Sequence, residues 1–257
     1  MKHAFKKMNY EEDVVFSSEI YWKHKKILYS RPTPCIMLLC YNDSLFNLVT
    51  SKYKNEKIKG FFGDVRVLKA FNYKIGILGK FGVGGPVTAV LTEDLKQWGV
   101  KIIISLGLGA SLQKDVNIGD FIIVEKALRD EGTSFHYEPN QEYAFASDEL
   151  LKKISSNNTF KNIKLHYGSV WTTDAIYRET RSEILTYQSK NILAVEMETA
   201  TLYTVGKYCN IQCVSIIGVS DSIALLKWEF KNNLDEIINQ FLILLDILLE
   251  YLQNEFI

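Results

Sequence analysis

Three carboxylates placed beside two apolar runs are the residues of this chain best suited to chemistry. Glu196 and Glu198 follow the apolar run that begins at Ile192, and Asp221 follows a second apolar run at 214–219. The segment between them has helical spacing, so the stretch predicts a strand, a helix and a strand. Ligands of an open α/β sheet bind beyond the carboxyl ends of its strands. One acid there could be an ordinary solvated cap, but three favour a site.

This stretch resembles the nucleoside phosphorylase superfamily, which includes purine nucleoside, methylthioadenosine and uridine phosphorylases and related nucleosidases. The resemblance rests on Val-Glu-Met-Glu at 195–198, the helix after it, and the apolar strand that ends in Ser-Asp at 220–221. It extends from about Lys74 to Trp228, over half of the chain. It implies that the protein cleaves the bond between the sugar and the base of a nucleoside.

The resemblance also implies roles for the acids. Glu198 would hold the ribose 2′ and 3′ hydroxyls, Met197 would pack against the sugar, and Glu196 would bind the ribose or orient its neighbours. Asp221 would protonate the purine leaving group. These roles suit the reaction, because a carboxylate can position the sugar and a buried carboxylic acid can supply a proton near neutral pH.

A glycine-rich stretch, Gly-Lys-Phe-Gly-Val-Gly-Gly-Pro at 79–86, precedes a predicted helix. Glycines let backbone amides approach an anion at a helix N-terminus, so Gly82, Gly84 and Gly85 are candidate phosphate ligands. A tight strand-to-helix turn without a ligand is the equal alternative. Superfamily members carry a similar Gly-x-Gly-x-Pro turn, and Arg129 or Arg178 is the cation we expect to assist it.

Two polar loops contain further candidates. The first, ALRDEGTSFHY at 127–137, is either a surface loop whose charges pair with one another or a binding loop. It resembles a uridine-phosphorylase-like branch of the superfamily. In the second loop, the resemblance implies residues that stack on the base and hydrogen-bond to it. The candidate base contacts are Trp171, Thr172, Ile176, Tyr177 and Arg178.

The chain departs from the family pattern where phosphate would bind. Family phosphorylases carry Gly-Asp-Pro-x-Arg after the first strand, but this chain has Cys-Tyr-Asn-Asp-Ser-Leu at 40–45. Ser105 stands near the place of a further arginine, and Leu108 stands where a phosphate-binding threonine is expected. A buried phosphate would therefore lack its usual bidentate arginine partner.

Composition excludes several other functions. The chain has 257 residues, 47% of them hydrophobic, and 30 basic residues balance 30 acidic ones. This neutral balance gives no reason to expect nucleic acid or a membrane surface as a partner. We find no signal peptide and no run long enough to span a bilayer. The four cysteines lack metal-binding spacing, so we expect free thiols, no metal and a cytoplasmic protein.

Alternating strand and helix patterns predict an α/β fold with one domain: three α/β/α layers around a mostly parallel mixed sheet, as in nucleoside phosphorylases. We expect an N-terminal lead-in segment at 1–34 and a catalytic domain at 35–257. Apolar runs predict strands at 35–41, 65–71, 74–78, 100–106, 121–124, 165–171 and 214–219. Helices are expected at 43–52, 87–98, 142–155 and 229–250, with Asp43 or Ser44 as the first N-cap, and turns at 54–63 and 107–111.

The sequence therefore predicts phosphorolysis of a purine nucleoside to free base and ribose 1-phosphate, with inorganic phosphate as co-substrate and no cofactor. Purine is favoured because the purine-cleaving members have an aspartate at the place of Asp221. The alternatives are a nucleosidase that uses water, with Glu196 or Asp43 as its base, a uridine phosphorylase, and a nucleoside-binding protein without turnover. The resemblance also implies a homo-oligomer, a dimer or a ring of dimers, in which His24 or His3 reaches a neighbour's ribose.

Overall fold

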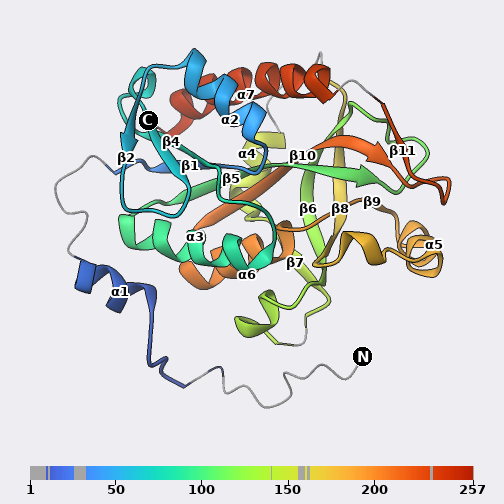
Figure 1. The fold of residues 1–257 in the computed structure, drawn as a ribbon, viewed down its shortest axis with the longest axis horizontal. Coiled ribbons are helices and arrows are strands. Elements are labelled where there is room, and N and C mark those ends of the chain that lie inside the picture. The colour runs from blue at the N-terminus through green and yellow to red at the C-terminus, as the bar shows by residue number, and fades with distance from the viewer. Residues whose placement is uncertain are drawn as a thin grey trace.

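A central mixed sheet lies between two layers of helices in the computed structural model of the chain (Figure 1), which describes residues 10, 12–25, 33–139, 141–155, 160, 163–231 and 234–256. The helices α2 (Asp43–Lys52), α4 (Asp148–Ser155) and α7 (Leu234–Phe256) cover one face of the sheet, and α3 (Gly85–Trp98) and α6 (Thr199–Cys209) cover the other. The short helix α1 (Ser18–Lys25) packs outside α3, and α5 (Arg181–Ser189) lies at one end. The predicted α/β class with three layers is confirmed.

The strands of the sheet fall into two parallel groups. Parallel pairing joins β4 (Ile75–Gly79), β1 (Ile36–Cys40), β5 (Ile102–Ser111) and β10 (Gln212–Ser222), and separately β6 (Phe121–Asp130), β8 (Leu165–Thr173) and β9 (Ile192–Glu196). Antiparallel pairs of β10 with β6 and of β5 with β9 join the groups into a closed ring. The remaining strands, β2 (Asn55–Ile58), β3 (Asp64–Leu68), β7 (Tyr143–Phe145) and β11 (Glu229–Phe230), pair antiparallel at the margins.

The core follows from the apolar runs of the sequence. All five residues of β1 are buried, as are all five of β4, because helices cover both faces of these strands. The long helix α7 buries one apolar side, including Phe241, Leu245 and Leu249, against the sheet. The described part of the chain contains no helix with the length and apolar character required to cross a bilayer. The four cysteines are free thiols, three of them buried.

Several predicted boundaries were wrong. Asn42, rather than Asp43 or Ser44, caps α2, because its side chain accepts a hydrogen bond from the Leu45 amide. The expected turn at 54–63 contains β2, and the expected helix at 142–155 begins with β7 and becomes helical only at Asp148. The segment expected as a helix from 229 starts with β11, and α7 begins at Leu234.

The predicted turn at 107–111 is instead the second half of β5. A Cβ atom at Gly109 would lie 2.6 Å from the Val195 carbonyl oxygen and 3.1 Å from the Ile217 side chain. Glycine is needed here because β5 passes between β9 and β10 with no room for a side chain. The glycines that indicated a turn thus mark a close approach between strands, and this approach brings the ends of β9 and β10 together.

Candidate active site

Glu198 links the N-termini of two helices. It is the N-cap residue of α6, and its Oε1 accepts a hydrogen bond of 2.6 Å from the amide of Gly84, the N-cap residue of α3. Gly84 has a φ of +99°, which favours glycine at this position. The Glu198 side chain is buried, and its burial together with the nearby charge of Glu196 raises its pKa to about 8.

Glu196 is buried beside it at the end of β9, where the protein satisfies both carboxylate oxygens. Oε2 accepts from the amides of Glu198 (2.9 Å) and Thr199 (2.8 Å) and from the Thr199 hydroxyl (2.8 Å). Oε1 accepts from the Thr172 hydroxyl at 2.5 Å. Burial raises the pKa of Glu196, and these donors oppose the shift. The arrangement fixes the backbone of Glu198 and the first turn of α6.

Asp221 lies half-buried near the end of β10 with a donor on each oxygen. The Ser220 hydroxyl donates to Oδ1 at 2.6 Å, and the Trp228 indole nitrogen donates to Oδ2 at 2.8 Å. The carboxyl of Glu179, in the loop after β8, lies close enough to interact electrostatically with Asp221. Its burial and the negative charge of Asp221 raise the pKa of Glu179 to about 7.

Strand β5 brings these acids to the same place. The Cβ position of Gly109 lies 3.5 Å from the Cβ of Glu196, and the Gly109 carbonyl oxygen accepts the Ser220 hydroxyl at 3.3 Å. Glu196 and Ser220-Asp221 therefore flank one short stretch of β5, and Glu198 follows Glu196 by two residues. This is the sheet edge at which the sequence placed them.

The predicted phosphate ligands are arranged differently. The Gly84 amide is already occupied by Glu198, and a Cβ at Gly85 would meet the hydroxyls of Thr201 (2.7 Å) and Thr133 (2.9 Å). Gly82 is exposed with a φ of +86°, so the turn itself needs glycine. These glycines serve the tight turn and the packing of α3 against α6.

Arg129, which the sequence predicts as a phosphate ligand, is engaged by the protein itself in this structure. Its guanidinium is buried and donates to the Ser134 hydroxyl (2.8 Å) and to the backbone carbonyls of Gln141 (3.1 Å) and Glu138 (2.5 Å). It also lies 4.2 Å from the centre of the Phe135 ring. Arg129 therefore holds the segment after β6 in place, because it supplies donors to carbonyls that would otherwise be unpaired.

The predicted base contacts divide into two sets. Trp171 is buried and donates to Asp130 at 3.0 Å, and Thr172 is buried within the Glu196 network, so neither is exposed to a base. The sequence predicted that the strand ends at residue 171, so these two residues were assigned to the loop. In the structure β8 continues to Thr173 and contains both of them. Ile176, Tyr177 and Arg178 form an exposed 3₁₀ turn after β8, so they remain candidate base contacts.

The first strand is followed by a residue that the sequence did not indicate, and the N-terminal segment contains the two predicted histidines. Tyr41 follows β1, at the family's phosphate loop, and its hydroxyl lies 2.7 Å from that of Thr88 on α3. Its ring packs edge-on against that of Phe81, with the ring centroids 5.0 Å apart. His24 is exposed on α1, and His3 lies outside the described residues.

Sequence reasoning missed four residues of this region: Thr199, Tyr41, Glu179 and Trp228. Glu179 lies in the loop that the sequence singled out, so its carboxyl could have been proposed. In the sequence Tyr41 looks like the end of a buried strand and Thr199 like the start of a helix, so neither indicated a role in the site. Trp228 reaches Asp221 only because the chain reverses between β10 and β11, which local spacing does not reveal.

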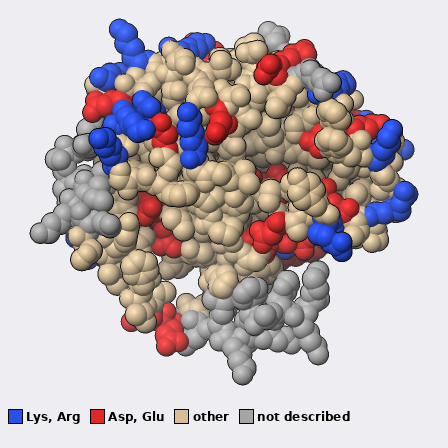
Figure 2. Space-filling view, in the orientation of Figure 1, with Lys and Arg blue, Asp and Glu red and all other residues tan. Residues whose placement is uncertain are grey.

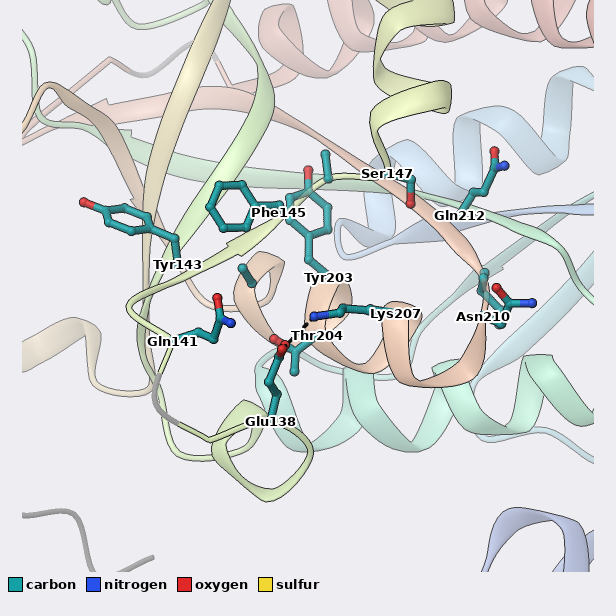
Figure 3. Close-up of a pocket in the computed structure, with 13 residues that line it drawn as sticks. Glu138, Gln141, Tyr143, Phe145, Ser147, Tyr203, Thr204, Lys207, Asn210 and Gln212 are labelled. Atoms are coloured by element: carbon teal, nitrogen blue, oxygen red, sulfur yellow. Dashed lines mark hydrogen bonds and ion pairs between the residues drawn. The ribbon is translucent and has the colours of Figure 1, made fainter. Parts of the chain in front are cut away.

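A different part of the surface contains a groove of about 350 Å³ between α6 and the segment that leads into α4 (Figure 3). Lys207 and Glu138 form an ion pair of 2.6 Å within it. Tyr203 and Thr204 donate their hydroxyl protons to backbone carbonyls, so they are not available to a ligand. The acids described above do not line this groove.

The comparison with known families identifies the class of protein. A sequence model described as the Phosphorylase superfamily matches residues 47–250. The chain belongs to this superfamily. The match includes all three acids at 196–221 and the glycine-rich turn, and it confirms the resemblance seen in the sequence.

Individual relatives within the family differ in their named activities. The DeoD-type purine nucleoside phosphorylase of Bacillus cytotoxicus is 35% identical over 144 residues, which are 55% of this chain and 61% of the relative. The uridine phosphorylase of Vibrio fischeri ES114 aligns with a TM-score of 0.66 and 27% identity, over 77% of this chain and 85% of that protein. The AMP nucleosidase of Bacteroides thetaiotaomicron shares the fold, with a TM-score of 0.71 and 22% identity. The alignment covers 91% of this chain and 99% of that protein.

The raised pKa of Glu198 predicts a specific pH dependence of stability. The folded chain retains a proton on Glu198 from its ordinary pKa of 4.5 up to about 8, so stability is lost as pH rises through this window. Glu198→Gln keeps an acceptor for the Gly84 amide but cannot ionise. From pH 5 to pH 8, we expect the wild type to lose at least about 1 kcal/mol more free energy of unfolding than the variant in urea titrations.

The matched control is Glu229→Gln, which neutralises an exposed carboxylate on β11. Its pH profile should follow that of the wild type. If the free energy of unfolding has the same pH dependence in the wild type and in Glu198→Gln, the raised pKa of Glu198 is contradicted.

Proposed function

We propose that this protein cleaves the N-glycosidic bond of a purine nucleoside, with Glu198 on the ribose hydroxyls and Asp221 as the acid for the leaving base. One observation supports this most: buried Glu196, which accepts the Glu198 amide, and donor-bound Asp221 flank the same stretch of β5. The bond breaks as positive charge develops on the ribose and negative charge on the base, so a carboxylate and an acid are needed on opposite sides.

In this proposal, Glu196 is a positioning residue rather than a ribose ligand. Its two oxygens accept four hydrogen bonds from the protein, so they are not free for sugar hydroxyls. It holds the amide of Glu198 and so sets the direction of that side chain. Met197, between the two acids, is proposed to contact the sugar. Ile176, Tyr177 and Arg178 are proposed to close over the base.

Inorganic phosphate is the first candidate for the nucleophile, which would give free base and ribose 1-phosphate. The phosphorylase names of two relatives support it. The AMP nucleosidase shares only the fold, so it adds no support for either nucleophile. The exposed amides of the turn at Gly82 are the remaining donors that we propose for phosphate, since Arg129 is engaged elsewhere.

Hydrolysis is the second candidate, and the electrostatics of the site favour it. Glu196, Glu198, Asp221 and Glu179 gather at this edge, and Glu198 already occupies the Gly84 amide at the α3 N-terminus. Figure 2 also shows acidic side chains below and to the right of the centre of this face, with basic side chains beside them and at the right margin. Water, unlike a phosphate dianion, needs no cationic ligand beside these acids. The proposed bases are less suitable, because Glu196 is engaged and Asp43 is exposed.

Base release from a panel of purine and pyrimidine nucleosides, with and without inorganic phosphate, tests the proposal. We expect purine release to exceed pyrimidine release. Strict dependence on phosphate with ribose 1-phosphate as product would identify a phosphorylase, and free ribose without phosphate a nucleosidase. Preference for uridine would contradict the purine assignment, and binding without turnover would contradict the enzymatic one.

Asp221→Asn separates the role of the acid from binding. The amide keeps the shape of the side chain and cannot donate a carboxyl proton, so we expect purine release to fall by at least about 100-fold. The affinity for the nucleoside, measured by calorimetry, should change by less than about threefold because the ribose contacts remain. Unchanged turnover would contradict the assigned role.

We also propose a homo-oligomer, a dimer or a ring of dimers, located in the cytoplasm. The N-terminal segment exposes Val14, Val15 and Phe16, and Val83 of the glycine turn is 60% exposed, so apolar side chains are available for a contact between subunits. His24 is exposed on α1 and is proposed to reach the ribose of a neighbour. A monomer in light scattering would contradict this assembly.

A further inference from the structure

The segment after Asp221 folds back over it. β11 pairs antiparallel with β10, so that Phe230 lies opposite Asp221 and Glu229 lies opposite Ser222. The turn between the strands is anchored, because Gln188 donates to the Ala224 carbonyl (2.9 Å) and the Leu226 amide donates to that of Ile223 (2.9 Å). This reversal brings the indole of Trp228 back to the acid.

Trp228 is not a core residue. The residue is 61% exposed, and its ring stacks on that of Phe230, which is 54% exposed, with centroids 4.5 Å apart and planes 22° apart. The stack fixes the orientation of the indole, and the indole nitrogen points at Asp221 Oδ2 at 2.8 Å. Exposure of two large aromatic rings is unfavourable, so packing alone does not account for them.

The two donors on Asp221 differ in kind. The indole can only donate, whereas the Ser220 hydroxyl can donate or accept. That hydroxyl also has a second acceptor, the Gly109 carbonyl oxygen at 3.3 Å. A protonated carboxyl accepts best through its carbonyl oxygen, so an indole on Oδ2 leaves the proton on Oδ1.

From this geometry we propose that Trp228 is a positioning residue, which orients Asp221 and assigns the transferable proton to Oδ1. The inference rests on the proposed function. In the reaction, the O–H bond at Oδ1 breaks and a bond from this proton to a base nitrogen forms as the glycosidic bond breaks. Asp221 is then left as a carboxylate, which Ser220 and Trp228 both stabilise as donors.

Trp228→Phe tests the role, because it retains an aromatic ring against Phe230 and removes only the donor. The two substrates are a purine nucleoside and its N7-methylated form, whose positively charged base leaves without a proton. We expect kcat/KM for the unmethylated nucleoside to fall by about 10-fold through kcat, and that for the methylated nucleoside to change by less than about twofold. A merely structural role would lower both equally.

Trp22→Phe is the matched control, because the Trp22 indole donates to another aspartate, Asp94, at 2.7 Å on the other side of the fold. Its ratio of the two activities should equal that of the wild type. An equal loss on both substrates, or no loss, in Trp228→Phe would overturn the role of Trp228 alone. A wild type inactive on every nucleoside would overturn the proposed function and this role with it.

The hydrogen bond can also be read without turnover. In ¹⁵N-labelled protein, the indole N–H resonance missing from Trp228→Phe is assigned to Trp228. We expect Asp221→Ala to shift this resonance and to leave the other three tryptophan resonances in place. A Trp228 resonance that does not move would overturn the proposal even if neither substrate is cleaved by the variants.

Discussion

The hydrogen bond from the Gly84 amide to the buried carboxyl of Glu198 is the interaction on which the site depends. It ties the start of α3 to the start of α6, two helices that pack together on one face of the sheet. A carboxylate at two helix N-termini is stabilised by their dipoles, while burial and Glu196 oppose its charge. The Glu198 side chain is thus held in one orientation, with a pKa of about 8. Sugar hydroxyls that approach it would meet a preorganised acceptor.

The second constraint is the passage of β5 between β9 and β10. A side chain at Gly109 would collide with the Val195 carbonyl, so these strands meet only because the residue is glycine. The same carbonyl group of Gly109 accepts the Ser220 hydroxyl, which connects the acid on β10 to the acids after β9. The distance between the groups that hold a sugar and a base is thus set by backbone packing in the sheet. Rigid strands place such groups more reliably than loops.

Much of this could be predicted from the sequence, because the strong signals are local. The buried runs of β1, β4 and β10 and the periodic helices α2 and α3 were recognised with small boundary errors. The acids at the ends of β9 and β10 were found because strand ends follow from those runs. Glycines were ambiguous: at 79–86 they form a turn, whereas at 107–109 they let strands approach.

What the sequence could not show depends on contacts between distant segments. Arg129 looks like an anion ligand in a polar loop, but its guanidinium satisfies carbonyls up to twelve residues further along the chain. In the sequence Trp171 and Thr172 look like loop residues. In the structure they belong to β8 and are buried where the strands of the sheet close into a ring. Trp228 gains its partner through a chain reversal. In each case the residue type indicated a polar or aromatic contact, but tertiary packing decided which partner the side chain meets.

The most direct test of the nucleoside site is a crystal structure of the protein soaked with a purine nucleoside and its slowly cleaved analogue. The account predicts the ribose 2′ and 3′ hydroxyls on Glu198 and a base nitrogen within hydrogen-bond distance of Asp221 Oδ1. A nucleoside bound elsewhere, for example in the groove beside Lys207, with Glu198 and Asp221 uncontacted, would contradict it.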